Sequence, residues 1–262
     1  MARRFKLLGT GAGPGTPSFF CECPGCREAL ENPVYGRTRS GAMITSEDSN
    51  ILVDTPPDLR VQLLREKINQ IDYIFLTHWH YDHFGGLGEL EYYVKLKRKE
   101  RLPLYLPASA KNAFDDAFPN LTDVFRVESW KFGKRYFIGN LSITPLPACH
   151  GIETAGFLVE SGTKRLAYFP DTAALPAETA RSVAAVDWLI VDATFYGENW
   201  FPEAHMSVDQ AINLGLAVNA RQTVFTHLSI HYSRPVINEE LTAVAVQHPG
   251  VLVGYDGMVF EL

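Results

Sequence analysis

Four residues of metal-binding type lie within six positions of one another, in the run His78-Trp79-His80-Tyr81-Asp82-His83. Imidazole nitrogens and a carboxylate oxygen are ligands that suit zinc, manganese or iron. A polar loop with scattered histidines would seldom place three of them at alternating and adjacent positions beside an aspartate. The spacing therefore predicts a metal site in this part of the chain.

Three further residues of this type follow strands that the sequence predicts later in the chain. His150, Asp171 and His227 each come directly after an apolar run. A lone histidine is more often structural, so each of these residues is a weak signal by itself. Together with the first cluster they can complete two metal sites. Two divalent ions about 3.5–4 Å apart can stabilise both the attacking and the leaving oxygens of a hydrolysis.

Three cysteines lie within six residues, in Cys21-Glu22-Cys23-Pro24-Gly25-Cys26. Thiolates at this spacing, with Pro-Gly turning the chain, are typical of a zinc knuckle; unligated thiols or a redox pair are the alternatives. Residues 18–40 have little apolar periodicity, so a closed zinc site would supply order that a small core cannot. We therefore expect a structural zinc ion whose fourth ligand comes from elsewhere in the chain.

The elements that must position these residues alternate between strands and helices. Residues 71–76 predict a buried strand and residues 87–99 a helix, which places the histidine cluster on a tight strand-to-helix turn. The Gly-rich run 9–17 lacks the Lys-Ser/Thr ending of a phosphate-binding loop and predicts a turn that could still line an anion pocket. Other strands are predicted near 5–9, 42–46, 50–54, 102–106, 125–127, 136–138, 141–147, 156–160, 165–169, 188–192 and 223–226. A strand pair is predicted around the turn 254–257. Other helices are predicted at 57–67, 108–118, 176–185, 207–219 and 237–247.

Each half of the chain runs in the order strands, helix, strand, helix, and each places His or Asp residues at strand ends. This order predicts two similar halves packed face to face, with sheets inside and helices outside. Because no low-complexity linker separates the halves, we expect one α/β domain over residues 1–262, with a Cys-rich zinc-knuckle insertion at about 18–40. Asp54 ends an early strand, where it can hold an imidazole N–H or cap a turn.

The composition limits the classes of partner. The chain has 262 residues, 46% hydrophobic residues and a net charge of -6, which argues against a broad basic surface for nucleic acid. No stretch approaches the ~20 apolar residues needed to span a bilayer, and the N-terminus has no secretory apolar run. We expect a soluble cytoplasmic protein whose cysteines bind metal or stay free. Whether it forms a homodimer is left open.

The pattern His-x-His-x-Asp-His, followed by a later His, Asp and His, resembles the metallo-β-lactamase superfamily. The resemblance implies a four-layer αββα sandwich with one or two metals at its rim. It also implies specific ligands: His78, His80 and His150 for the first metal; Asp82, His83 and His227 for the second; Asp171 as the bridging carboxylate; and Asp54 beside the ligands.

The Gly-Thr-Gly opening, the Cys cluster, Asp171-Thr172 and Gly254-Tyr-Asp-Gly-Met resemble the branch that contains the phosphodiesterase of the carbon–phosphorus lyase pathway, in phosphonate metabolism. This resemblance implies that Cys21, Cys23, Cys26 and His231 bind a structural zinc ion. It also implies that His205 acts as an acid or binds phosphate. A superfamily protein of the pyrroloquinoline quinone pathway carries a similar Cys cluster, so the cluster does not decide the substrate.

The leading hypothesis is a hydrolase of a small or cyclic phosphodiester, such as a 5-phosphoribosyl 1,2-cyclic phosphate, with two Mn²⁺ or Zn²⁺ ions. In this hypothesis a hydroxide that bridges the metals attacks phosphorus. Asp82 and His205 are the candidate catalytic residues, and His205 protonates the leaving oxygen unless it only caps a turn. The alternatives are a thioester, lactone or lactam hydrolase, a tRNA-processing nuclease, and a non-hydrolytic partner in cofactor biosynthesis, because a fold does not determine function.

Overall fold

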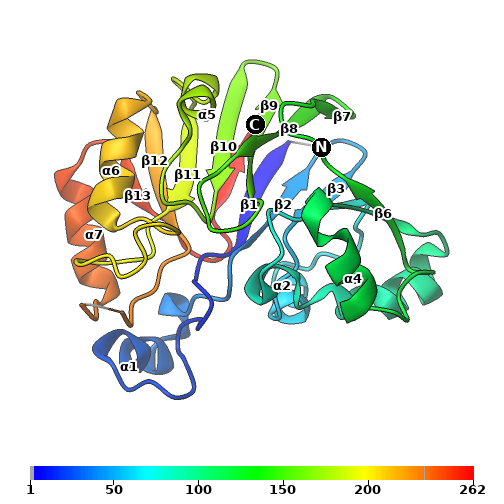
Figure 1. Ribbon diagram of the computed structural model, residues 1–262. Helices are drawn as coiled ribbons and strands as arrows, with labels where there is room; N and C mark the ends of the chain where they lie inside the picture. The colour runs from blue at the N-terminus through cyan, green and yellow to red at the C-terminus, as the bar shows by residue number, and fades with distance from the viewer. Residues whose placement is uncertain (1–2, 233) are drawn as a thin grey trace.

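The computed structural model describes residues 3–232 and 234–262, and these form two mixed sheets packed face to face with helices on both outer sides (Figure 1). The first sheet runs in the order β14 (Val259–Glu261), β1 (Arg4–Gly9), β2 (Gly41–Thr45), β3 (Asn50–Val53), β4 (Tyr73–Phe75), β5 (Leu102–Leu106), β6 (Phe125–Ser129). The second runs β13 (Val251–Val253), β12 (Gln222–Thr226), β11 (Trp188–Asp192), β10 (Lys164–Phe169), β9 (Ala155–Ser161), β8 (Leu141–Pro147), β7 (Tyr136–Ile138). The predicted αββα sandwich is confirmed.

Three hydrophobic clusters correspond to the three interfaces between the four layers. The middle cluster joins the two sheets and includes Phe5, Phe75, Phe157 and Tyr168. The other two lie between each sheet and its own helices. Because both faces of each sheet are covered, central strands such as β11 are buried along nearly their whole length, which explains their continuous apolar runs.

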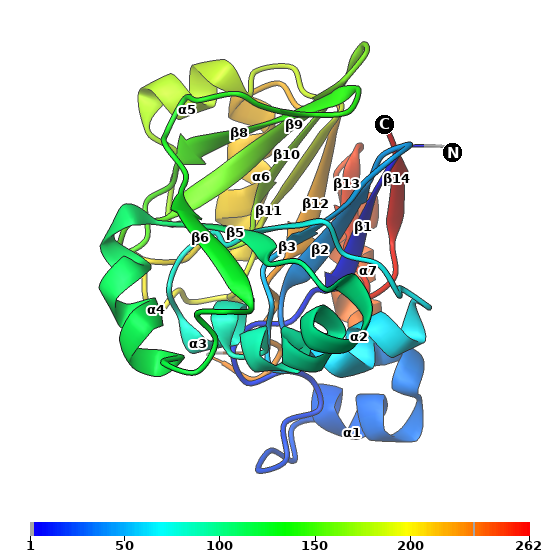
Figure 2. The same ribbon diagram turned by 90° about the vertical axis from the view of Figure 1, so that its right-hand side faces the viewer.

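The helices divide between the two outer faces. Figure 2 shows α2 and α4 on the side of the first sheet, and α5 and α6 on the side of the second. The helical segments are α1 (Pro24–Glu31), η1 (Pro33–Tyr35), α2 (Leu59–Arg65), α3 (Tyr81–Phe84), η2 (Leu87–Leu90), η3 (Tyr93–Arg98), η4 (Ala108–Ala110), α4 (Lys111–Ala117), α5 (Ala177–Ser182), α6 (Val208–Ala217) and α7 (Asn238–Gln247). Within the described ranges, none of them is both long and apolar enough to cross a membrane.

Two sequence predictions about helices need correction. Residues 87–99 form two short segments, η2 of the 3-10 type and η3 of the π type, in place of one α-helix. Residues 18–40, which have little apolar periodicity and for which no helix was predicted, contain the helix α1. Cys23 caps the N-terminus of this helix, because its Sγ accepts a hydrogen bond from the Cys26 N–H. Pro24 follows at the first helical position, where proline is favoured.

The closing strand pair was also predicted wrongly. The turn at 254–257 separates β13 from β14 as expected, but the two strands join different sheets. β13 pairs in parallel with β12, and β14 pairs antiparallel with β1. The first sheet therefore contains the first and the last strands of the chain.

Parallel strands bring chemistry-bearing residues to one rim of the sandwich. In the first sheet β3, β4, β5 and β6 are parallel neighbours, and in the second β10, β11, β12 and β13 are. The carboxyl ends of parallel strands meet at the same edge, where ligand sites are commonly built.

Candidate metal centre

The rim holds all seven residues of the predicted dinuclear site, contributed by both sheets. His78 and His80 follow β4, and Asp82 and His83 lie on the short helix α3 directly after them. His150, Asp171 and His227 follow β8, β10 and β12. Their ligand atoms form overlapping groups, each with all its atoms within 4.8 Å of one another: His78, His80 and His150; His78, His83 and Asp171; Asp82, His83 and His227.

The first group places three imidazole nitrogens against each other. His80 Nδ1 lies 2.9 Å from His78 Nε2 and 3.1 Å from His150 Nε2. His150 uses its other nitrogen, Nδ1, to donate a hydrogen bond to the Ala204 carbonyl at 2.8 Å, which leaves a lone pair on Nε2. Lone pairs that converge in this way repel one another unless a cation lies between them, so this group can hold a metal ion.

The second group is built around Asp171. His83 Nε2 lies 3.0 Å from Asp171 Oδ2, and His227 Nε2 lies 3.2 Å from Asp171 Oδ1. Both nitrogens lie 3.5 Å from Asp82 Oδ2. Yet three buried atoms of this group have no hydrogen-bond partner within residues 3–232 and 234–262. They are His83 Nε2, His227 Nε2 and Asp171 Oδ2. Buried polar atoms normally have partners, so these orphaned atoms fit a divalent cation.

Asp54 orients two of the histidines of the first sheet. Its Oδ2 accepts a hydrogen bond from His83 Nδ1–H at 2.8 Å. It also accepts from the Thr77 hydroxyl at 2.9 Å, and the oxygen of that hydroxyl lies 2.9 Å from His78 Nδ1. Each imidazole therefore carries its hydrogen on Nδ1 and presents Nε2 to the site. The predicted contact between Asp54 and an imidazole is present.

Asp192 does the same for the second sheet, and the sequence interpretation gave it no role. Its Oδ1 accepts from the Thr194 hydroxyl at 2.8 Å, and that oxygen lies 2.9 Å from His227 Nδ1. Its Oδ2 accepts directly from His205 Nδ1–H at 2.7 Å. Asp192 is the last residue of β11, and Asp54 directly follows β3. This shared position at the end of a strand was the signal in the sequence that could have indicated a role for Asp192.

Backbone strain marks two of these positions. Asp54 and His227 have φ of 63° and 54°, in the left-handed region that residues with a side chain seldom adopt. Each directly follows a strand and turns its side chain into the rim. Strained residues of this kind persist where the surrounding structure fixes them, and they cluster at functional sites.

The pKa shifts of Asp82 and His78 favour the forms in which these two side chains bind metal. Burial would raise the pKa of Asp82, but the neighbouring His83 and His227 outweigh it and hold the pKa well below its usual range. Burial lowers the pKa of His78, and the like charge of His83 lowers it further. Carboxylates that stay ionised and imidazoles that stay neutral are the forms that bind metal. Burial would lower the pKa of His83, but the carboxylates of Asp171, Asp82 and Asp54 raise it.

His205 has the opposite shift. Burial alone would lower its pKa, but the hydrogen bond to Asp192 and the charge of that carboxylate raise the pKa to about 9. The imidazole is therefore protonated at neutral pH. Its Nδ1–H is bound to Asp192 and Nδ1 lies 3.8 Å from Asp171 Oδ1, so the proton on Nε2 is the one available for donation beside the proposed ligands.

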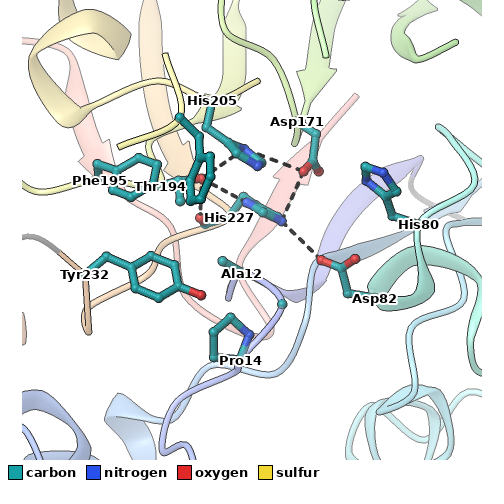
Figure 3. Close-up of a pocket in the computed structure, with 12 residues that line it drawn as sticks. Ala12, Pro14, His80, Asp82, Asp171, Thr194, Phe195, His205, His227 and Tyr232 are labelled. Carbon is teal, nitrogen blue, oxygen red and sulfur yellow. Dashed lines mark hydrogen bonds and ion pairs between the residues drawn. The ribbon is translucent and has the colours of Figure 1, made fainter. Parts of the chain in front are cut away.

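A cavity of about 200 Å³ opens next to this cluster (Figure 3). Ala12, Gly13 and Pro14 form part of its wall, so the Gly-rich turn lines a pocket. A Cβ at Gly13 would lie 3.3 Å from Asp82 Oδ2, so this turn passes close to the carboxylate. The remaining lining residues are His80, Asp82, Asp171, Thr194, Phe195, Phe201, His205, His227 and Tyr232. Tyr232 was not singled out from the sequence.

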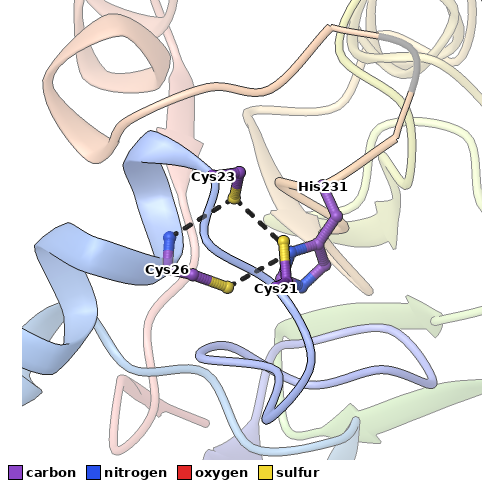
Figure 4. Close-up of side chains that lie close together, drawn as sticks. All are labelled: Cys21, Cys23, Cys26 and His231. Carbon is purple, nitrogen blue, oxygen red and sulfur yellow. Dashed lines mark hydrogen bonds between the residues drawn. The ribbon is translucent and has the colours of Figure 1, made fainter.

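The cysteine cluster forms a separate group (Figure 4). Cys21, Cys23 and Cys26 lie with His231, all four ligand atoms within 4.8 Å of one another. His231 Nδ1 is 3.3 Å from Cys26 Sγ and 3.6 Å from Cys23 Sγ. Its Nε2–H donates to the Gly15 carbonyl at 2.7 Å, so Nδ1 offers a lone pair to the sulfurs. Three sulfurs and one imidazole are a donor set that fits zinc.

Comparison with known proteins agrees with this geometry. Residues 49–228 match the family model described as Beta-lactamase superfamily domain, so the chain belongs to that family. Its sandwich is the metallo-β-lactamase fold. A crystal structure described as a new diphosphatase from the PhnP family superposes with a TM-score of 0.86 at 26% identity, covering 99% of this chain and 98% of the other.

Two relatives by sequence have different names. The coenzyme PQQ synthesis protein B of Methylobacterium nodulans is 26% identical over 98% of this chain and 99% of its own length. A protein of Porphyromonas gingivalis named octanoyltransferase is 28% identical over 97% of this chain, but the chain spans only 51% of that protein. The family is thus established, while its members are named for different activities.

Proposed function

We propose that this protein is a metal-dependent hydrolase that cleaves a small or cyclic phosphodiester. The observation that carries the proposal is the convergence of imidazole lone pairs and carboxylates around atoms that have no partner among the described residues. We assign His78, His80 and His150 to one divalent ion, and Asp82, His83 and His227 to a second, with Asp171 between them. Mn²⁺ and Zn²⁺ both suit this donor set.

The side chains around the proposed ligands supply the rest of the chemistry. Bound divalent ions would neutralise charge at the phosphoryl group and activate water. Asp54 and Asp192 hold the histidine tautomers described above. His205, protonated through its contact with Asp192, donates a proton to the departing oxygen as general acid. Asp82 borders the pocket, where it can accept a proton or position the attacking group.

We also propose that the chain is one domain over 1–262 in which the segment 18–40 is a zinc-bound insertion. Cys21, Cys23, Cys26 and His231 would hold the structural zinc ion. This group involves none of the proposed dinuclear ligands, so its role is stability and not chemistry. The ion would tie the loop before α1 to the segment after β12, which are far apart in sequence.

A second candidate is hydrolysis of an acyl thioester or a lactone at the same site. The relative named octanoyltransferase favours this reading, although the chain matches only half of that protein. The relative in coenzyme PQQ synthesis keeps a third candidate open, a non-hydrolytic partner in cofactor biosynthesis. Since all three use the same fold, only turnover of defined substrates can choose among them.

The test is an assay of the manganese- and zinc-loaded protein on bis-p-nitrophenyl phosphate, 2′,3′-cyclic nucleotides, a cyclic ribosyl phosphate, a thioester and a lactam. We expect phosphodiester turnover that His80→Ala abolishes. His248→Ala, at the C-terminal end of α7, is the matched control and should retain it. Thioester cleavage without turnover of any phosphodiester would overturn the proposal.

A further inference from the structure

One wall of the pocket is aromatic. Phe195, Trp200 and Phe201 come from the loop after β11, and Tyr232 comes from the segment after β12. We call these four residues the aromatic wall. The Phe195 and Tyr232 rings lie 5.7 Å apart, Trp200 and Tyr232 5.9 Å, and Phe195 and Phe201 6.2 Å. Figure 3 shows Tyr232 with its hydroxyl directed into the pocket, opposite His80. Phe195, Phe201 and Tyr232 line the pocket beside the proposed metal ligands, and Trp200, which is not a lining residue, packs against Tyr232.

The aromatic wall is exposed where a ligand could reach it. Phe195 is fully buried and supports the others, whereas Trp200 and Phe201 are 51% and 52% exposed. The loop is nevertheless fixed. Asn199 Oδ1 accepts from the Phe201 N–H at 2.9 Å, and Asn199 Nδ2–H donates to the His205 carbonyl at 2.7 Å. Large apolar side chains that a fixed loop presents to solvent beside a pocket indicate a binding surface.

The same pocket offers a substrate no lysine or arginine side chain, and His205 is the proton donor among its described lining residues. The described lining residues include Asp82 and Asp171 but no lysine or arginine. Arg39 lies behind the pocket wall, where its guanidinium donates to the Gly13 carbonyl at 2.9 Å and to Asp58 at 3.0 Å. The Arg234 guanidinium lies over the Tyr196 ring, 5.0 Å from its centroid. A second phosphate on the substrate would therefore find no lysine or arginine in the pocket, where His205 is already assigned to the departing oxygen.

We propose, on the basis of the phosphodiesterase function above, that the substrate carries a flat, uncharged aromatic group of the nucleobase type beside its phosphodiester. This group stacks on Phe201 and Tyr232 while the phosphodiester occupies the metal centre. Aromatic side chains bind bases of any sequence through their ring faces. Because Phe201 is 52% exposed, the base can lie at the edge of the cavity of about 200 Å³ while the phosphodiester lies inside it.

The test compares ligands with and without a base. Binding of adenosine 3′-monophosphate and of ribose 5-phosphate to the metal-loaded protein is measured by calorimetry. We expect the nucleotide to bind about tenfold more tightly or better, which corresponds to ~1.4 kcal/mol. Phe201→Ala should remove this preference, and Phe201→Tyr should keep it. Phe137→Ala, which removes an aromatic ring on β7 that is 74% exposed, should also keep it.

Equal affinities, or a preference that survives in Phe201→Ala, would overturn the inference. Thermal melting of each variant excludes misfolding as the cause of a lost preference. Turnover of bis-p-nitrophenyl phosphate is measured in parallel. If this diester is cleaved but the base preference is absent, the inference fails and the proposed function stands. If the preference is present but no phosphodiester is cleaved, the aromatic wall binds bases and the proposed function fails.

Discussion

At the scale of single residues, Asp54 and Asp192 show how one carboxylate can fix two imidazoles. Each contacts one histidine directly and a second through a threonine hydroxyl, and each belongs to a different sheet. A carboxylate partner fixes the tautomer and the ring orientation of a histidine. Each sheet thus contributes one carboxylate that orients histidines of the same centre. In the second sheet His205 contacts that carboxylate directly, as His83 does in the first.

Asp192→Asn should therefore lower phosphodiester turnover by about 10–100-fold, the usual effect of losing a residue that orients ligands. Because the Asp192 charge raises the pKa of His205, its removal should lower that pKa. The protonated imidazole, and with it activity, should then be lost at a lower pH than in the parent protein. The measurement is kcat against pH. Asp116→Asn, on the exposed surface of α4, should leave the profile unchanged, and an unchanged profile in Asp192→Asn would contradict the role.

The sequence contained much of this site but not all of it. His78, Asp171 and His227 could be predicted because each follows an apolar strand, and strand ends gather at one rim. Asp192 has the same position, yet the carboxylate alone does not reveal that it contacts His205 across the following loop. Tyr232 could not be predicted, because an aromatic residue beside His231 has no spacing that indicates a pocket.

At the scale of elements, close packing of α6 on β12 depends on a glycine. A Cβ at Gly215 would lie 2.0 Å from Thr223 Oγ1, so the helix rests on the strand with no room for a methyl group. α6 begins just after His205, and β12 ends just before His227. The distance between these two histidines therefore depends on this contact.

Gly215→Ala should destabilise the protein by about 1–3 kcal/mol, the usual cost of overpacking a well-packed interface. Urea denaturation measures the free energy of unfolding. Gly88→Ala is the matched control, since a Cβ at Gly88 would meet no atom within 4 Å, and its stability should change by less than about 0.5 kcal/mol. Equal effects of the two substitutions would show that α6 can move away from β12 without cost.

Elements with strong periodicity were predicted well, and the errors have physical reasons. Strands such as β3 and β11 are apolar runs that need both faces covered. α1 was missed because Pro24-Gly25 indicates a turn, whereas proline at a first helical position starts a helix. The partners of β13 and β14 are set by distant strands, and the sequence near the turn carries no information about them.

At the scale of the whole molecule, the cysteine cluster joins the N-terminal region to the segment after β12. Because the unfolded chain has no such site, the free energy of binding the proposed zinc ion contributes to the free energy of folding. The same segment carries Tyr232 of the aromatic wall, next to His231. Loss of the ion should loosen this end of the molecule.

Cys23→Ala should remove roughly one zinc ion per chain and lower the melting temperature, while turnover at permissive temperature is affected less. Metal content is measured by plasma mass spectrometry and melting by circular dichroism. Cys149→Ala, which removes the one cysteine outside the cluster, should keep that zinc ion. Retained zinc and an unchanged melting temperature in Cys23→Ala would refute the structural role.

The pairing of β1 with β14 also has a consequence for how the chain folds. Arg4 and Glu261 lie side by side in the first sheet although 257 positions separate them in sequence. During synthesis β1 leaves the ribosome long before β14, so one edge of the first sheet stays unpaired until residues 259–261 arrive. Contacts of such high sequence separation slow folding, and an open edge is a template for pairing with other chains. The last strand therefore replaces the six-residue edge of β1 by an edge of three residues, and a short edge is a poorer template for pairing with other chains.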